Sequence, residues 1–343
     1  MLLRFLSPRL ACFLLAITAT LSQAADGAAA TLRVGVLQFG TVNWELDVVQ
    51  ANKLAQKRGL TLKVVPLASG DASTVALQGG AVDVIVSDWI WVTRQRADGM
   101  NVTFAPYSNA VGSVMVKTDS VIHSIADLKG KSIGISGGPY DKTWLLLRAY
   151  ANKKLGMDLA GATRPVYAAP PLLNELALSG QVDAALNVWH YDARLEANGL
   201  RPLIKLPEIL AGLGVDKPIP LIGWVFREDW ANQNRETMER FLAASQEAKG
   251  ILAKSDAEWE RLKPLMHAED NATFVALRTG YRNGIPSCEQ PDAQSSIPQD
   301  RRELSAVHSL LRSHRVSGRG RSGEHAAPGC AGSPWRFRVA LHR

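Results

Sequence analysis

The sequence predicts an α/β protein built from two lobes of like topology, each a mostly parallel sheet flanked by helices. The first observation is an internal repeat at an offset of 100 residues, which aligns "VDVIVSDWIWVTRQRADG" (82–99) with "VDAALNVWHYDARLEANG" (182–199). The second is that "VGVLQFGTVNW" (34–44) resembles "IGISGGPYDKTW" (133–144) after one insertion. The third is that β-branched runs alternate with helical patterns in both halves, as in parallel sheets covered on both faces. Self-similarity of this kind indicates a repeated structural unit.

The first lobe is expected to alternate strands and helices in order along the chain. Apolar runs of strand length and patterns of helical period predict strands at 33–39, 60–67 and 82–87, and helices at 43–59, 71–80 and 88–99. Gly59 directly follows the first helical pattern, and a glycine at that place commonly ends a helix.

The second lobe repeats this order, and two extended segments connect the lobes. Strands are expected at 131–136, 164–169 and 182–188, and helices at 140–156 and 170–180. The segments 111–120 and 217–228 read as hinge strands, and the chain after 228 is helical with faces suited to the first lobe. We therefore expect the first lobe to comprise 31–117 and 221–286, and the second lobe 118–220.

The N-terminus is typical of export. Arg4 and Arg9 precede the apolar stretch "LACFLLAITATL", and Ser22-Gln23-Ala24 resembles a cleavage site, so residues 1–24 are expected to be a secretory signal peptide. A buried core helix is the alternative. No later run is long enough to span a bilayer, which predicts a soluble mature protein in the periplasm.

The positive charge belongs to the C-terminal tail. Residues 301–343 hold nine arginines and two glutamates, a balance of +7, which equals the net charge of the whole chain. The rest of the chain is neutral, so its composition does not indicate nucleic-acid binding. Residues 287–343 lack periodicity and are expected to be either a disordered arm or the product of a reading-frame shift.

Four strand-to-helix turns are candidates for a ligand site, at 38–44, 87–89, 136–144 and 187–190. Ligands of open parallel sheets bind beyond the carboxyl ends of the strands, where helix N-termini present free N–H groups. In the third turn, glycines let the backbone approach a ligand and proline stiffens the start of the helix. The residues that this reasoning selects are Trp44, Ser87, Asp88, Trp89, Gly137, Gly138, Pro139, Asp141, Asn187 and Trp189.

Structural explanations compete with each of these assignments. Gly-Gly-Pro can be a tight connection, and a tryptophan more often fills a core than contacts a ligand. Trp91 and Trp144 are expected in the core, whereas Asp88 and Asp141 can cap helices. The charge of the ligand is left open, because tryptophan with aspartate suits a cation and helix N-termini suit an anion.

Several motifs together resemble the periplasmic solute-binding proteins of ABC importers, in the nitrate/sulfonate/taurine group with its relatives that bind thiamine precursors. They are "LRVGVLQFG" (32–40), "ALQGGAVDVIVSD" (76–88), "SIADLKGKSIGIS" (124–136) and "LSGQVDAALNVW" (178–189), and the resemblance covers residues 32–286. It implies a two-lobe periplasmic binding protein fold of type II, with a pocket at Thr41, Val42, Asn43, Ser87, Asp88, Gly137, Gly138, Pro139, Asn187 and Trp189. Gly-Gly-Pro stands where many sulfonate and nitrate binders place polar or basic side chains.

The expected function is therefore that of an exported receptor that closes on a small solute and delivers it to an ABC permease, without catalysis. We expect a monomer without cofactor, bound metal or nucleic acid, since no nucleotide loop, nucleophile elbow or Cys/His cluster is present. One alternative is an enzyme similar to pyrimidine-precursor synthases, with His190 as acid or base. Another is a ligand-sensing partner of a membrane kinase.

Overall fold

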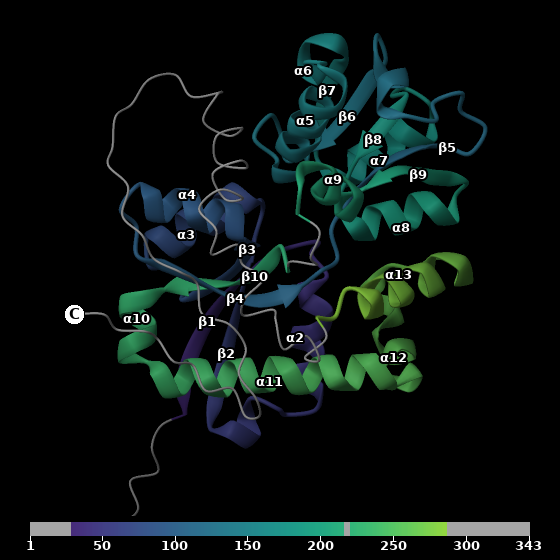
Figure 1. Cartoon of the computed structure of the whole chain (residues 1–343). Coiled ribbons are helices and arrows are strands. Elements are labelled where there is room, and N and C mark those ends of the chain that lie inside the picture. The colour runs from purple at the N-terminus through teal and green to yellow at the C-terminus, as the bar shows by residue number, and fades with distance from the viewer. Residues whose placement is uncertain (1–28, 216–219, 287–343) are drawn as a thin grey trace, which may run out of the picture.

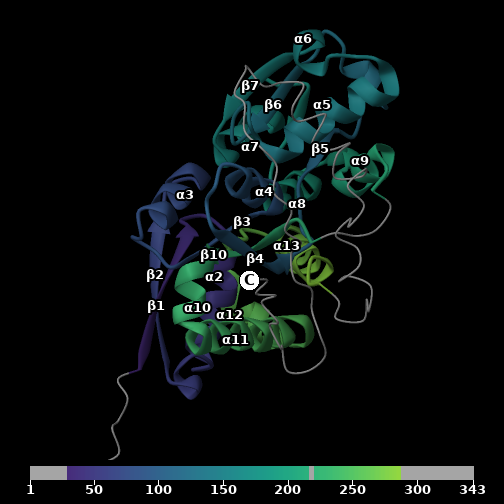
Figure 2. The ribbon, with the colours of Figure 1, turned by 60° about the vertical axis from the view of Figure 1, so that its left-hand side comes forward.

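The computed structural model describes residues 29–215 and 220–286, which form two stacked α/β lobes (Figure 1). The first sheet has the order β2-β1-β3-β10-β4 and the second the order β7-β6-β8-β5-β9. Figure 2, turned by 60°, shows the second lobe still above the first. The strands are β1 (Ala30–Leu37), β2 (Leu60–Leu67), β3 (Val84–Asp88), β4 (Val102–Ser108), β5 (Ser113–Lys117), β6 (Ser132–Ser136), β7 (Arg164–Ala168), β8 (Ala184–Leu186), β9 (Leu200–Lys205) and β10 (Ile222–Arg227).

Each sheet is mixed, because it contains an antiparallel strand that follows a crossing of the chain from the other lobe. β1, β2 and β3 are parallel, but β10 runs antiparallel between β3 and β4. In the second sheet β5 likewise runs antiparallel between β8 and β9. The chain therefore enters the second lobe at 109–112, before the boundary at 117 expected from the sequence, since 113–117 pairs within the second sheet. β4 and β9 had no counterpart among the expected strands.

Helices cover both sheets. Those between the strands are α2 (Val42–Ala51), α3 (Gly70–Gln78), α4 (Trp89–Ala97), α5 (Lys142–Leu155), α6 (Leu159–Ala162), α7 (Pro170–Leu178), α8 (Trp189–Ala197) and α9 (Leu206–Leu213), with 3₁₀ turns η1 (Gln56–Arg58) and η2 (Ile125–Leu128). After β10 the chain forms α10 (Glu228–Gln233), α11 (Arg235–Lys254), α12 (Asp256–Met266) and α13 (Asn271–Asn283). α11 runs along the first lobe, as expected (Figure 1). Among the described residues, no helix has the length and apolar character needed to cross a membrane.

The helix expected at 43–59 is shorter in the structure. α2 ends at Ala51, because the chain turns at Asn52 and Lys53 takes the left-handed φ of 55°. Leu54 then packs into the core with 1% of its surface exposed, so burial of this leucine outweighs continued helical hydrogen bonding. Gly59 does end the following 3₁₀ turn in the left-handed conformation, at φ 64°.

The sequence repeat has a structural cause in its shared Val-Asp pair. Asp83 accepts hydrogen bonds from the backbone N–H of Arg33 at 2.8 Å and from its guanidinium. Asp183 accepts from the N–H of Ser132 at 2.7 Å and from its hydroxyl at 2.6 Å. In both lobes the aspartate thus ties the start of the third strand of the repeat to the first strand.

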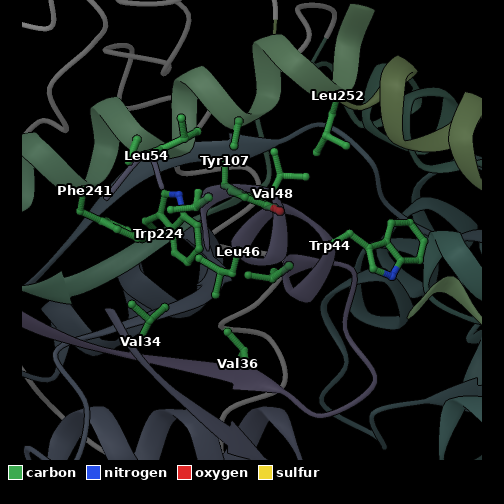
Figure 3. Packing of buried hydrophobic residues seen from close by; sticks show 14 of the residues in the cluster. Val34, Val36, Trp44, Leu46, Val48, Leu54, Tyr107, Trp224, Phe241 and Leu252 are labelled. Carbon is green, nitrogen blue, oxygen red and sulfur yellow. The ribbon is translucent and has the colours of Figure 1, made fainter. Parts of the chain in front are cut away.

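The largest core lies in the first lobe, between the sheet and α2, α11, α12 and α13. Figure 3 shows Trp224 and Phe241 packed together, with Trp44 apart from them toward one end of the cluster. The ring centroids of Trp224 and Phe241 are 4.8 Å apart in an edge-to-face arrangement. Trp44 brings the first core up to the boundary between the lobes, where its ring meets that of Trp189.

Candidate site at the lobe boundary

The side chain of Asn43, which the sequence predicted to line the ligand pocket, holds the turn from β1 to α2. The amide nitrogen of Asn43 donates to the backbone oxygens of Leu37 and Gly40, both at 2.9 Å. Asn43 therefore braces the turn. Thr41 and Val42 are each 8% exposed, whereas Phe39 at the tip is 66% exposed.

The equivalent turn of the second lobe, from β6 to α5, has two glycines in the left-handed region. Gly137 has φ 80° and Gly138 has φ 86°, which a residue with a Cβ adopts only with strain. Asp141 then caps α5, as its Oδ1 accepts from the N–H groups of Thr143 at 2.9 Å and Trp144 at 3.0 Å. These constraints leave Pro139 and its neighbour at the exposed tip of the turn.

Ser87 and Asp88 end β3, and Asp88 caps α4 through a 2.9 Å bond from the Trp91 N–H to its Oδ1. All three of Ser87, Asp88 and Trp89 are half-buried. Trp89 packs against the core of the second lobe, and its Nε1 is enclosed without a hydrogen-bond partner within the described chain. The first lobe thus inserts an aromatic ring into the second.

The fourth turn, from β8 to α8, is braced as firmly as the first. Asn187 is buried, and its amide nitrogen donates to Pro170 O at 3.0 Å and to Asn174 Oδ1 at 2.9 Å. Its own Oδ1 accepts from the Val188 N–H at 2.8 Å. A Cβ at Gly112 would lie 1.7 Å from Asn187 O. The backbone of the segment that crosses between the lobes therefore lies directly against the backbone of this turn. Asn187 therefore positions the end of β8.

Trp189 mirrors Trp89 at the equivalent position of the repeat, since it packs against the core of the first lobe. Its ring meets Trp44 edge to face, with centroids 6.1 Å apart at 88°, and lies 6.4 Å from Tyr281. Each lobe thus sends one tryptophan across the boundary. Trp144 is 1% exposed, as expected of a core residue, and half-buried Trp91 packs against a first-lobe cluster.

A carboxylate of the first lobe affects the pKa of one in the second lobe at this boundary. Burial raises the pKa of Asp141, and the negative charge of Asp88 adds to this effect. The Lys142 ammonium and the capped N–H groups act in the opposite direction. One carboxylate oxygen of each aspartate caps a helix. The boundary therefore has a carboxylate on each side and one lysine next to them.

Burial at the boundary strongly lowers the pKa of His190. Burial lowers its pKa to about 3, the Arg194 charge contributes in the same direction, and a hydrogen bond with the backbone of Phe39 opposes them. Its Nε2 is enclosed without a partner in the described residues. The imidazole is therefore neutral at ordinary pH, and it is a poor general acid for the alternative enzymatic function.

Residues that sequence reasoning missed also lie at this boundary. Arg194 donates from Nη1 to His267 O at 2.9 Å and from Nη2 to Met266 O at 2.6 Å, which links α8 to the end of α12. Tyr281 and Gly280 of α13 contact Trp189. Arg194 matches Arg94 in the repeat, but nothing in the local sequence indicates a contact with the distant α12.

Elsewhere, the structure shows two open cavities away from these turns, of about 430 and 400 Å³. The first is lined by 117–119, Leu178 and 198–200, and the second by Glu260 and residues 263–264 and 267–269. Within residues 29–215 and 220–286, no group of three or more His, Cys, Asp or Glu side chains is arranged to hold a metal ion. The expected signal peptide (1–24) and tail (287–343) lie outside the described residues.

A family model described as NMT1/THI5 like matches residues 55–258. A comparison with curated proteins finds no match.

Solved structures with similar folds include two sulfonate-binding proteins. The alkanesulfonate-binding protein SsuA from Xanthomonas axonopodis pv. citri, bound to MOPS, superposes with a TM-score of 0.63 at 18% identity, over 82% of this chain and 93% of that one. The periplasmic aliphatic sulphonate binding protein SsuA from Escherichia coli gives 0.63 at 19% identity, over 83% and 92%.

A ligand-binding component of an ABC-type import system from Staphylococcus aureus, with zinc bound, gives a TM-score of 0.57 at 14% identity, over 83% and 92%. At these identities the likenesses establish the two-lobe periplasmic binding protein fold.

Proposed function

Since the chain belongs to the NMT1/THI5-like family, we propose that it is the solute-binding component of an ABC importer. In this role it captures a small molecule between its lobes and delivers it to a permease in the inner membrane. It acts without catalysis, as a monomer in the periplasm. The fold shared with a ligand-binding component of an ABC-type import system supports this role.

The observation that carries the proposal is the meeting of four strand-to-helix turns at the boundary of two lobes. Thr41, Ser87, Asp88 and Trp89 approach from the first lobe, and the turn 137–141 approaches from the second. Closure of one lobe on the other is the movement by which such an arrangement encloses a ligand. We assign direct contact to these residues and a bracing role to Asn43 and Asn187, while Val42, Trp44 and Trp189 form the apolar floor.

The charges at the boundary support a ligand that is not strongly anionic. Asp88 and Asp141 come from opposite lobes, and the pKa of Asp141 is already raised by burial and by Asp88. Even with the Lys142 ammonium beside Asp141, a sulfonate placed between the two carboxylates would add negative charge to a partly dehydrated site that is already negative, which is unfavourable. We therefore propose a neutral or cationic solute, although two structures of the same fold bind sulfonates.

A native mass spectrum of the mature protein, purified from its periplasm, tests this function. We expect a stoichiometric small-molecule adduct that partial unfolding releases chemically unchanged. A purified permease complex should then hydrolyse ATP faster when the loaded protein is added. Conversion of the released molecule on incubation with fresh protein would instead favour an enzyme, and failure to stimulate ATP hydrolysis would contradict the transport role.

A further inference from the structure

Helix α8 belongs to the second lobe by its chain connections, yet it packs on the first lobe. It follows β8 of the second sheet directly, but it contacts α13 along its length, and the two helices lie against each other in Figure 1. Ala193 is 7% exposed and belongs to the first-lobe core, together with the half-buried Trp189 one turn earlier. One face of α8 is thus buried by the opposite lobe.

The ring of Trp189 fits a socket whose size is set by Gly280. Trp44 and Tyr281 form its walls, with centroids 6.1 and 6.4 Å from that of Trp189. A Cβ built on Gly280 would lie 2.8 Å from Cζ3 and 3.0 Å from Cε3 of the indole, closer than carbon atoms pack. Any residue larger than glycine at this position of α13 therefore forces the indole or the helix to shift.

Arg194 makes a second, polar attachment between the same two lobes. Its two Nη atoms donate to the carbonyl oxygens of Met266 and His267 at 2.6 and 2.9 Å. Those carbonyls belong to the C-terminal end of α12, where backbone acceptors lack helical partners and a cation is favoured. Asp192 meanwhile accepts a 2.6 Å hydrogen bond from the N–H of Ser113, the first residue of β5, so α8 is also joined to the strand that follows the crossing into the second lobe.

Unfavourable contacts at the same boundary oppose these attachments. Trp89 Nε1 and His190 Nε2 are both enclosed without partners in the described part of the chain. Each loses hydrogen bonds to water when the lobes meet, which favours separation. The contact between the lobes thus combines a well-fitting socket with two buried polar atoms that lack hydrogen-bond partners among the described residues. This combination is suited to reversible opening.

We propose that α8 is an interlobe latch, which holds the receptor closed through Trp189 in its socket and Arg194 on the end of α12. Opening then requires both side chains to leave the first lobe. Arg194 is a positioning residue in this account, because it sets the balance of open and closed forms without contacting the solute. The inference concerns the fold, and it holds whether the protein serves transport or sensing.

Distance measurements between spin labels on the ligand-free mature protein test the latch. Labels at Val75→Cys and Leu172→Cys report on opposite lobes, since these side chains are 65% and 55% exposed on α3 and α7. Cys288→Ser and Cys330→Ser remove the native thiols that remain after export. Partial unfolding and dialysis remove any bound solute before the spectra are recorded.

The decisive variant is Gly280→Ala, with Gly250→Ala as its matched control. Both replace a helical glycine, which by itself favours the helix, but a Cβ at Gly250 meets nothing within 4 Å. We expect Gly280→Ala to add a population at longer interlobe distance, while Gly250→Ala keeps the wild-type distribution. Identical distributions for the two variants would overturn the latch and make α8 and α13 a fixed pivot.

A second pair of variants keeps the proposal falsifiable if Gly280→Ala folds poorly. Arg194→Ala should raise the ratio of open to closed forms roughly tenfold, the scale of lost hydrogen bonds to a charged group. Arg94→Ala alters the exposed equivalent in the repeat and should change nothing. Circular dichroism melting checks that both variants are folded, and an unchanged distance distribution for folded Arg194→Ala contradicts the proposal.

Discussion

The buried ion pair between Glu45 and Lys249 should be the most sensitive point of the first lobe. Glu45 is 0% exposed on α2 and Lys249 is 5% exposed on α11. The carboxylate accepts from the Lys249 ammonium, from the Ser245 hydroxyl at 2.5 Å and from the Tyr281 hydroxyl at 2.8 Å. Burial lowers the pKa of Lys249, and Glu45 counteracts this. Each charge is thus tolerated because the other is present.

Lys249→Met should lower the free energy of unfolding by about 3 kcal/mol. Removal of one partner from a buried pair costs about 3–5 kcal/mol, because the remaining charge has lost its compensation. The two hydroxyl donors that still reach Glu45 place the value at the low end of this range. Adding Glu45→Gln removes the stranded charge and keeps an acceptor for one of the two hydroxyls, so the double variant should regain about 2 kcal/mol.

Urea unfolding followed by far-UV circular dichroism at pH 7 measures these differences. Arg240→Met is the matched control, because Arg240 pairs with Glu236 on the exposed side of the same helix. Such a surface pair contributes about 0–1 kcal/mol. A loss below about 1 kcal/mol for Lys249→Met, or additive losses in the double variant, would refute the reasoning.

Three further predictions concern the boundary and the chain ends. The pKa of His190 is lowered to about 3 from 6.5, so the folded state keeps it neutral and its contribution is lost as pH falls from 6.5 toward 3. His190→Gln should therefore flatten the fall in stability between about pH 6.5 and 4 in urea titrations, and an unchanged pH dependence would exclude this histidine as the cause. Trp189→Ala should weaken binding of the solute identified by native mass spectrometry by about 1–3 kcal/mol, measured by calorimetry; unchanged affinity with lower stability would limit Trp189 to a packing role. Trimming the protein to 25–290 should leave its thermal unfolding midpoint and its binding intact, because both sheets are complete within the described residues, whereas an unfolded product would show that the tail is structural.

Much of the fold could be predicted because it is encoded locally. Apolar runs with helical patterns between them placed β1, β2, β3, β6, β7 and β8 close to their observed bounds. The repeated Val-Asp pair predicted two like lobes, and Asp83 and Asp183 indeed make equivalent bonds to the first strand of their own lobe. The helix expected at 43–59 was too long, since the buried contact of Leu54 has no signature among its neighbours in sequence.

The four strand-to-helix turns could be predicted from the sequence, but the contacts of each side chain could not. The rule that ligands bind at the carboxyl ends of parallel strands located all four turns. This rule does not predict that the side-chain amide of Asn187 donates hydrogen bonds to Pro170 and Asn174, because those partners come from a separate helix. Asn43, in contrast, bonds only to nearby carbonyls of its own turn.

Features that depend on contacts between distant segments are determined by the tertiary structure alone. The antiparallel insertion of β10 and β5 depends on pairing with strands that are distant in sequence, and residue type does not specify it. The same is true of Trp89 and Trp189, whose rings cross to opposite lobes, and of Gly280, whose missing side chain makes room for one of them. Periodicity records which face of an element is buried, but the identity of the surface that buries it depends on the whole chain.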